Sequence, residues 1–367
     1  MDKQLIIGTA AHVRAVRIGE GFPVAIQTMW KDKLDLCGKD ETKNVIERIC
    51  LLEKLGCDIL RFAVPAIEDA EVLGKLCALT SMPLVADIHF DYKIALRIMD
   101  FPISKIRINP GNIGSKEKTA AVLKKAADKN IPIRIGVNGG SLPIDLRKQV
   151  EMGIKTRVEA LVEAAEREIA VFEEHNFTHV AVSMKASSVS ETIACNRLFS
   201  SHNGVPLHIG VTEAGPLIAG LVRNTAALYN LLCDGIGNTI RVSLSDTMEN
   251  EVIAAREILL AVQDANIAGG VSAGQGVRII SCPLCARCSF DTHAAAQKWQ
   301  TYLYSLRKPI TVAFMGCPVN GPGEARGADI GITGAGDKVL IFCGGKIKHR
   351  INKEDGEKIF KQELDLL

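Results

Sequence analysis

The chain has 367 residues and a formal net charge of +2, with 47% hydrophobic and 23% charged residues. This composition is typical of a folded globular protein, and the near balance of charge excludes a general polycation, so neither nucleic acid nor a membrane surface is an expected partner. No stretch reaches the ~20 apolar residues of a membrane-spanning helix and no signal-peptide pattern begins the chain, so we expect a cytoplasmic protein. The length exceeds that of one ordinary compact core, so we expect one large and one smaller domain.

Strand and helix patterns alternate along most of the chain. Eight runs rich in Val, Ile and Leu, separated by stretches with helical spacing, predict strands over residues 23–29, 58–64, 83–89, 104–109, 132–138, 179–185, 206–212 and 238–244. Eight such units within about 250 residues are typical of a TIM (β/α)8 barrel, so the expected fold class is α/β. Residues 1–20 predict a short hairpin that closes one end of this barrel.

A second domain is expected after the barrel. The Gly-, Ala- and Ser-rich residues 265–276 predict a linker, which assigns residues 1–264 to the barrel and residues 277–367 to a small α+β domain. Within that domain, short apolar runs predict three strands and a last amphipathic stretch predicts a helix, over residues 278–283, 311–318, 338–345 and 351–367.

Side chains of the predicted barrel strands separate onto two faces by alternation. In residues 132–138, Ile133 and Ile135 share one face, while Arg134 and Asn138 share the other, which should fill the barrel. The same division places further polar residues on the inner face: Arg61, Asp87, His89, Lys105, Arg107, Asn109, Ser183, Lys185, Arg241 and Ser243. Barrel interiors are usually apolar, so these residues predict a polar site.

Five of the eight strands carry Arg or Lys on that face, and Asp87 and Glu213 are the only acidic residues expected nearby. One inner cation could belong to a structural salt bridge, but five converging cations favour an anion site at the carboxyl-terminal mouth. Guanidinium forks and lysine suit phosphate oxygens, so more than one phosphate is expected. Glu213 lies just past a strand end, where barrel catalytic residues are found, and His89 stands beside Asp87 as an acid or base. His208 is expected to be a core residue.

Three evenly spaced cysteines, Cys282, Cys285 and Cys288, occur in SCPLCARCSFD, and Cys317 follows in GCPVNGPGEA. The C-x2-C spacing lets two thiolates hold one metal ion or one corner of a cluster. A structural zinc site needs four ligands, which Cys288 or Cys343 could complete, whereas an iron-sulfur cluster needs three or four thiolates. Spacing alone leaves both possibilities open.

The turn-forming residues after Cys317 should fold Glu324 back toward that cysteine. SCPLC followed by GCPVNGPGEA resembles the bacterial 4-hydroxy-3-methylbut-2-enyl diphosphate synthase family. Further motifs of that family occur in its order along nearly the whole chain: RFAVP, ADIHFDYKIAL, KIRINPGN, RIGVNGGSL, SMKAS, PLHIGVTEAG and GIGNTIRVSLS. The chain is therefore identified as a member of that family.

The resemblance implies a [4Fe-4S] cluster held by Cys282, Cys285, Cys317 and Glu324, with Cys288 where the family usually has a non-ligand residue. It implies the reductive opening of 2-C-methyl-D-erythritol 2,4-cyclodiphosphate to 4-hydroxy-3-methylbut-2-enyl diphosphate, with loss of water, in the non-mevalonate pathway of isoprenoid biosynthesis. Flavodoxin or ferredoxin would deliver two electrons, and a homodimer would share each active site between its subunits.

By the same resemblance, the inner-face residues hold the diphosphate. The expected contacts are Arg61, Arg107, Asn109, Arg134, Asn138, Lys185, Arg241 and Ser243. Glu213, Asp87 and His89 would bind substrate hydroxyls or supply a proton, and Glu324 would be an exchangeable ligand. The stretch QTMWKDKLDL after the first barrel strand departs from the family pattern, so no site residue is taken from it.

Two other functions are compatible with the residues. A zinc-containing barrel enzyme acting on a phosphorylated small molecule would use Cys288 as its fourth ligand. A redox or iron-sensing module would keep the cluster beside a barrel that no longer turns over a substrate. Iron and sulfide analysis separates the first alternative from the synthase, and substrate-dependent oxidation of the reduced cluster separates the second.

Overall fold

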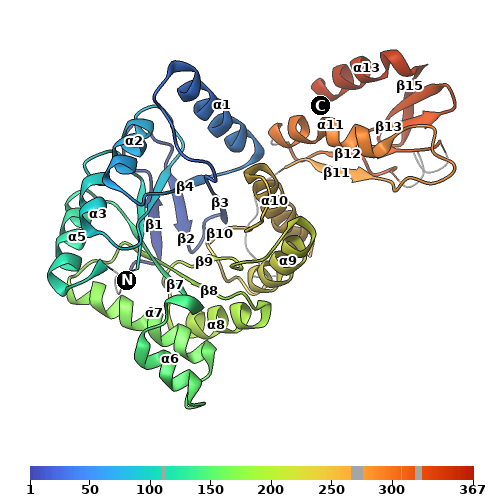
Figure 1. Cartoon of the computed structure of the whole chain (residues 1–367). Coiled ribbons are helices and arrows are strands. Elements are labelled where there is room, and N and C mark those ends of the chain that lie inside the picture. Colours follow the sequence, from blue (N-terminus) through green and yellow to red (C-terminus); the bar gives the residue numbers. More distant parts are fainter. Residues whose placement is uncertain (110–112, 266–275, 307, 319–324) are drawn as a thin grey trace. The chain divides into compact units, whose positions relative to one another are not determined.

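The computed structural model describes residues 1–109, 113–265, 276–306, 308–318 and 325–367. The chain forms two compact units, Met1–Gly274 and Gln275–Leu367, each with sheets and helices of its own (Figure 1). Almost all of the linker predicted over residues 265–276 lies outside the described residues.

Eight parallel strands form the barrel of the first unit. They are β3 (Ala25–Met29), β4 (Ile59–Ala63), β5 (Leu84–Asp87), β6 (Lys105–Ile108), β7 (Ile133–Asn138), β8 (Val180–Lys185), β9 (His208–Ile209) and β10 (Thr239–Ile240). The strand order is β8-β7-β6-β5-β4-β3-β10-β9, and a parallel bridge between Val182 and Leu207 joins its two ends. The predicted TIM barrel is confirmed, with all eight strands within their expected ranges.

Strands β9 and β10 are shorter than predicted because the backbone after each of them bonds to helix side chains. The amide of Asn224 accepts from the backbone N–H of Val211 at 3.5 Å and donates to the carbonyl of Ser243 at 3.3 Å. The carboxylate of Glu251 accepts from the N–H of Leu244 at 3.0 Å. These backbone groups are therefore satisfied without a neighbouring strand.

Helices surround the barrel strands (Figure 1). They are α1 (Lys39–Leu55), α2 (Ile67–Cys77), α3 (Tyr92–Ile98), α5 (Lys116–Asp128), α6 (Ile144–Glu151), α7 (Arg157–Glu174), α8 (Val189–His202), α9 (Leu217–Cys233) and α10 (Met248–Asp264). Local sequence fixes their ends, as in α7, where Thr156 and Glu159 form a capping box. Across the described ranges, no helix has the length and apolar character that a membrane crossing requires.

The predicted amino-terminal hairpin is confirmed as β1 (Gln4–Ile7) paired antiparallel with β2 (Val16–Gly19). Its inward residues pack against the first residues of the barrel strands in one buried cluster of Leu5, Ile7, Val16, Ile18, Ala25, Ile59, Val85 and Ala181. The hairpin thus covers the amino-terminal end of the barrel.

In its described residues, the second unit has one five-stranded sheet and two helices. These elements are β11 (Arg278–Ser281), α11 (Thr292–Ser305), β12 (Thr311–Met315), β13 (Ile330–Ala335), β14 (Lys338–Cys343), β15 (Lys346–Asn352) and α13 (Lys353–Asp365). The strands lie in chain order, with β11, β12 and β13 parallel and β14 and β15 antiparallel to their neighbours. The three predicted strands and the last helix are confirmed, whereas β13, β15 and α11 were not predicted.

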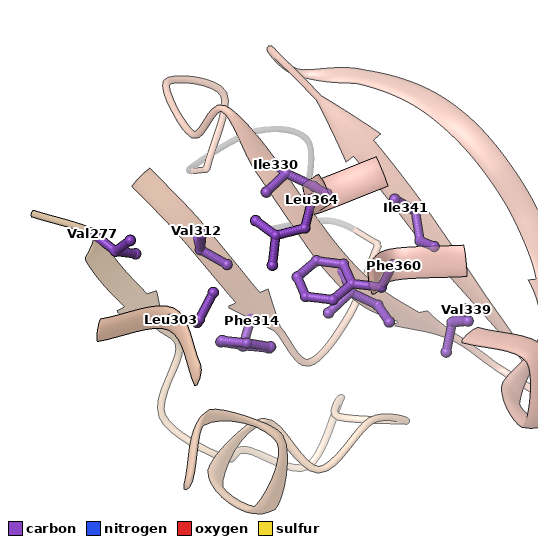
Figure 2. Packing of buried hydrophobic residues seen from close by; sticks show 10 residues of the cluster. Val277, Leu303, Val312, Phe314, Ile330, Val339, Ile341, Phe360 and Leu364 are labelled. Carbon is purple, nitrogen blue, oxygen red and sulfur yellow. The ribbon is translucent and has the colours of Figure 1, made fainter. Parts of the chain in front are cut away.

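The core of the second unit lies between this sheet and its helices (Figure 2). Val312 and Phe314 of β12 face this core together with Leu303 of α11 and Phe360 of α13. Alternate β12 residues turn to the other face, where Met315 packs in a smaller cluster that Cys282 adjoins. The cysteine-bearing segments therefore come directly after strands whose packing is fixed on both faces.

Candidate active site

A cavity of about 260 Å³ lies at the carboxyl-terminal ends of the barrel strands. Nine of the eleven predicted barrel residues line it: Arg61, Asp87, His89, Arg107, Arg134, Asn138, Lys185, Arg241 and Ser243. Parallel register brings them together, since Arg107 lies opposite Arg134 on the next strand and Asn138 lies opposite Lys185. We call this space the cationic cavity.

Asp87 is the buried carboxylate that joins two of these cations. Its oxygens lie 3.1 Å from Nη1 of Arg107 and 3.6 Å from Nε of Arg61, and His89 Nε2 is 3.5 Å away. Burial alone would raise the pKa of Asp87, but the hydrogen bond to His89 and the charges of Arg61 and Arg107 lower it well below its usual range. Asp87 therefore remains a carboxylate, which fits the binding of hydroxyls but not the supply of a proton.

Glycine at position 136 makes room for the guanidinium of Arg107. A Cβ at Gly136 would lie 2.4 Å from Nε and 2.5 Å from Nη2 of Arg107. Any larger residue would therefore push this guanidinium away from Asp87.

Arg134 and Lys185 are buried cations held by neutral partners. Arg134 is 1% exposed and donates from Nη1 to Ser183 Oγ at 2.5 Å, while its Nε and Nη2 have no hydrogen-bond partner among the described residues. Lys185 Nζ lies 3.2 Å from Nε2 of His208. Burial, followed by the charges of neighbouring cations, lowers the pKa of Arg134 and that of Lys185 well below their ordinary values. The cavity thus has a deficit of negative charge that a bound anion would offset.

His208 is a satisfied core residue, as predicted. It is fully buried, and its Nδ1 lies 2.8 Å from Thr239 Oγ1. Burial and the charge of Lys185 lower the pKa of His208 well below its ordinary value, so its ring is neutral and Nε2 accepts from Lys185. Lys105 lies deeper in the barrel, with Nζ 3.4 Å from Gln27 Oε1, and does not line the cavity.

Glu251 of α10 is a second buried carboxylate beside the cavity. Its oxygens contact Arg241 at 3.4 Å, Lys31 at 2.8 Å and Thr28 at 2.6 Å. Burial would raise the pKa of Glu251, but the charge of Arg241 and these hydrogen bonds hold it below its usual value. The prediction that Asp87 and Glu213 are the only acidic residues near these cations was therefore wrong.

The cysteine loop comes after β11 and meets the end of β12 in the second unit. The Sγ of Cys282 accepts from the N–H of Gly316 at 3.1 Å, and the Sγ atoms of Cys285 and Cys288 are 3.9 Å apart. A Cβ at Gly316 would lie 2.3 Å from Cys288 Sγ and 3.5 Å from Cys282 Sγ. Since Gly316 precedes Cys317, the parallel strands bring all four cysteines of the sequence motif to one end of the sheet.

This thiol-rich loop fits a metal cluster by its donor chemistry. A hydrogen bond from the backbone of Arg287 lowers the pKa of Cys285, which favours the thiolate that binds iron. Among the side chains that the structure describes, no three His, Cys, Asp or Glu groups lie close enough together to hold one metal ion. Glu324, the predicted fourth ligand, lies outside the described residues.

Both units match one sequence family. The profile of the GcpE TIM-barrel domain matches residues 8–256, and that of the GcpE protein C-terminal domain matches residues 278–366. The chain belongs to the GcpE family. The GcpE profiles cover the barrel with the cationic cavity and the unit with the cysteine loop.

Relatives within the GcpE family are similar over nearly their whole length. A protein of Treponema pallidum is 51% identical over 100% of this chain and 92% of its own, and one of Treponema denticola is 50% identical over 99% and 95%. A third, from Thermodesulfovibrio yellowstonii, is 45% identical over 94% of each chain. All three carry the name 4-hydroxy-3-methylbut-2-en-1-yl diphosphate synthase (flavodoxin).

Two of the predicted barrel site residues stand apart from the cavity lining. Asn109 is 6% exposed, and Glu213 is exposed and accepts from Ser187 Oγ at 3.0 Å. Glu213 has a φ of +54°, the left-handed region that L residues rarely adopt. Five lining residues were not among the predicted site residues: Met29, Gly136, Val137, Ser183 and Thr212. The catalytic assignment of Glu213 stays a prediction.

We expect Gly136→Ala to weaken diphosphate binding in the cationic cavity and to lower the free energy of unfolding. Its Cβ must displace Arg107 from Asp87, and overpacking of this kind costs about 1–3 kcal/mol of the free energy of unfolding. Urea unfolding and diphosphate titration measure the two effects. Gly140→Ala is the matched control, since its Cβ meets nothing closer than Asn138 Oδ1 at 3.7 Å. Equal stability of the two variants would contradict the close-approach explanation.

Proposed function

We propose that the chain converts 2-C-methyl-D-erythritol 2,4-cyclodiphosphate to 4-hydroxy-3-methylbut-2-enyl diphosphate in the non-mevalonate pathway of isoprenoid biosynthesis. The reaction takes up two electrons, opens the cyclic diphosphate and releases a hydroxyl as water. The observation that carries the proposal is the cationic cavity, where five cations face two carboxylates in a chain of the GcpE family: Arg61, Arg107, Arg134, Lys185 and Arg241 against Asp87 and Glu251.

The cationic cavity binds the diphosphate through donors that its own packing holds in place. Asp87 fixes Arg61 and Arg107, and Glu251 fixes Arg241, so these guanidinium groups need little reordering when the anion enters. Arg134 brings two buried N–H groups without a partner in the described part of the chain. These donors offset the negative charge that develops on the phosphate oxygen as it leaves carbon.

Release of the hydroxyl as water requires a proton at that oxygen. Asp87 is held as a carboxylate by its cations and serves as an acceptor for a substrate hydroxyl. His89 is half exposed at the cavity and contacts both Asp87 and Arg107. We assign the proton to His89, with Glu213 as the other candidate from outside the lining.

A [4Fe-4S] cluster is the cofactor that we assign to the cysteine loop. Cys282, Cys285, Cys317 and Glu324 would hold it, with Cys288 as a neighbouring thiol outside the ligand set. When bound, such a cluster supplies electrons one at a time at low potential, which protein side chains do not. The exposure of Cys285 and the burial of Cys317 give the loop one open and one closed side.

The electron donor and the location are inferred from the relatives and from the thiols. The relatives' names specify flavodoxin, so we propose flavodoxin as the donor in preference to ferredoxin. All eleven cysteines are free thiols, which suits a reducing compartment such as the cytoplasm.

We also propose a homodimer in which each active site uses the barrel of one subunit and the cysteine loop of its partner. Resemblance to the family supports this arrangement. Mixing two inactive proteins, Arg134→Ala and Cys317→Ser, tests it, because a mixed dimer would contain one intact barrel facing one intact loop. Recovered turnover supports a shared site. Mixed dimers that form without turnover would contradict it.

Anaerobic turnover is the experiment that tests the proposed reaction. Protein with a reconstituted cluster is given the cyclic diphosphate and reduced flavodoxin, and the product is identified by mass spectrometry. We expect one product molecule for two electrons consumed. A cluster that stays reduced when the cyclic diphosphate is added would contradict the synthase and favour the redox-module alternative.

Diphosphate binding should be accompanied by proton uptake at Lys185. Burial and the charge of Arg134 lower the pKa of this lysine in the free protein, and a bound polyanion raises it again. Between the two values, the dissociation constant should rise by up to about tenfold per pH unit. Calorimetry in buffers of different ionisation enthalpy measures the uptake, which Lys185→Met should reduce. Lys54→Met, on an exposed lysine in the last turn of α1, is the control, and equal uptake by both variants would exclude Lys185.

A further inference from the structure

A second cavity of about 430 Å³ adjoins the cationic cavity. It lies beneath the segment after β3, within the QTMWKDKLDL stretch that departs from the family pattern, and beside the end of β4. Met29 and Arg241 line both cavities, so these two side chains form the wall that the two spaces share. We call the second space the aromatic cavity.

Two stacked aromatic rings form its wall. The rings of Trp30 and Phe62 lie 5.4 Å apart with an interplanar angle of 21°. The guanidinium of Arg48 lies 5.5 Å from the Trp30 ring, and Trp30 and Phe62 are 7% and 2% exposed. Because these side chains are already packed, the cavity exists without rearrangement, as small-molecule sites usually do.

Five charged residues line the aromatic cavity: Lys31, Asp32, Lys33, Asp69 and Arg241. Three of them are engaged with other groups of the protein on this side of the cavity. Lys31 bonds to Glu251 and to the carbonyl of Leu244, both at 2.8 Å. Asp69 accepts from the N–H of Ala66 at 3.1 Å, and Asp32 pairs with Arg48. The remaining wall is largely apolar and includes Leu34, Ala63, Pro65 and Leu73.

The reaction proposed above gives this apolar space no role. The substrate of that reaction is a compact, hydroxylated five-carbon diphosphate, and the donors that suit the diphosphate group lie in the cationic cavity. An apolar cavity that meets a diphosphate-binding cavity suits a ligand with both parts, a hydrocarbon chain esterified to a diphosphate. Arg241 lines both cavities, so a ligand with its ester oxygen beside Arg241 would extend into each of them.

We propose that the aromatic cavity binds the hydrocarbon chain of a prenyl diphosphate, whose diphosphate group occupies the cationic cavity in place of the substrate. This inference rests on the proposed function for the position of the diphosphate. Prenyl diphosphates would therefore inhibit competitively, and their affinity would rise with chain length until the aromatic cavity is filled.

A chain-length series on the full protein tests the proposal. Inhibition constants are measured for methyl, dimethylallyl and geranyl diphosphate, with the cyclic diphosphate as the varied substrate. We expect geranyl diphosphate to bind at least about tenfold more tightly than methyl diphosphate, since each buried methylene contributes a factor of roughly four. Equal constants along the series would overturn the aromatic cavity as a ligand site. Absence of turnover and of binding by every diphosphate would instead overturn the proposed function.

Two variants locate the chain. Leu34→Asp places a charge in the lining of the aromatic cavity, and Ala63→Phe fills part of it, while neither residue lines the cationic cavity. Both should remove the advantage of geranyl diphosphate and leave the inhibition constant of methyl diphosphate within about twofold. If the advantage survives in both folded variants, the chain lies elsewhere and the proposal is wrong.

Discussion

The Cys317→Ser protein is expected to hold no iron-sulfur cluster and to lose more than about 100-fold of its turnover, since losing even an outer partner of a metal site costs 10- to 100-fold. Cys317 is buried directly after Gly316, whose N–H binds the Sγ of Cys282. Serine would fit this space but offers a hydroxyl that stays protonated, whereas iron requires the thiolate. Visible absorption and iron and sulfide content after anaerobic reconstitution measure the loss.

Cys288→Ser is the matched control for this ligand prediction. Cys288 belongs to the same loop, and its Sγ is 3.9 Å from that of Cys285, so position alone does not distinguish it from the proposed ligands. We expect this variant to keep its cluster and most of its turnover. Loss of the cluster in Cys288→Ser with retention in Cys317→Ser would show that the ligand set is wrong. One zinc per chain without sulfide would favour the zinc-containing alternative.

The cationic cavity could be predicted from sequence because a strand alternates its side chains strictly. Once Ile133 and Ile135 are assigned to the helix-facing side of β7, Arg134 must point inward, and parallel register places it beside Arg107. Glu251 escaped this reasoning because it lies on a helix. The sequence feature that could have revealed Glu251 is its place on the apolar face of α10, four residues before the buried Ala255.

The second unit was predicted less completely than the barrel. Helix α11 buries Thr292, Leu303 and Tyr304, and Ala295, Ala296, Trp299 and Tyr302 pack against the core at helical spacing, so its signal was present in the sequence but was not used. Strand β15 carries mainly polar residues, as edge strands often do. Its signal was the Gly344-Gly345 pair after β14, which has φ angles of +52° and +75° and forms the turn of a hairpin.

The position of Glu324 relative to the cysteines could not be derived from spacing. The turn-forming residues after Cys317 predict a reversal of the chain, but many reversals satisfy the same sequence. Assignment of Glu324 as a ligand therefore rests on the resemblance, and spectroscopy of a Glu324→Gln protein beside Cys317→Ser is its direct measurement.

Arg134→Ala should weaken diphosphate binding by about 2–5 kcal/mol, or roughly 30- to 5,000-fold, while leaving the cluster content unchanged. Arg134 is buried, and its Nε and Nη2 donate to no described residue, so these groups are available to a ligand and contribute little to stability of the fold. Titration with the cyclic diphosphate measures the loss. Arg197→Ala is the control, since Arg197 is half exposed on α8 and pairs with Asp234 at 2.7 Å.

The stability of the ligand-free protein separates a binding role from a structural one. Burial and the nearby positive charges of Arg61 and Arg107 lower the pKa of Arg134, which means that its charge destabilises the empty cavity. Arg134→Met removes that charge and keeps most of the side-chain volume, so its free energy of unfolding should equal or exceed that of the unaltered protein. A large loss of stability in Arg134→Met, with diphosphate affinity intact, would make Arg134 a structural residue and would remove the main support for an anion site in this barrel.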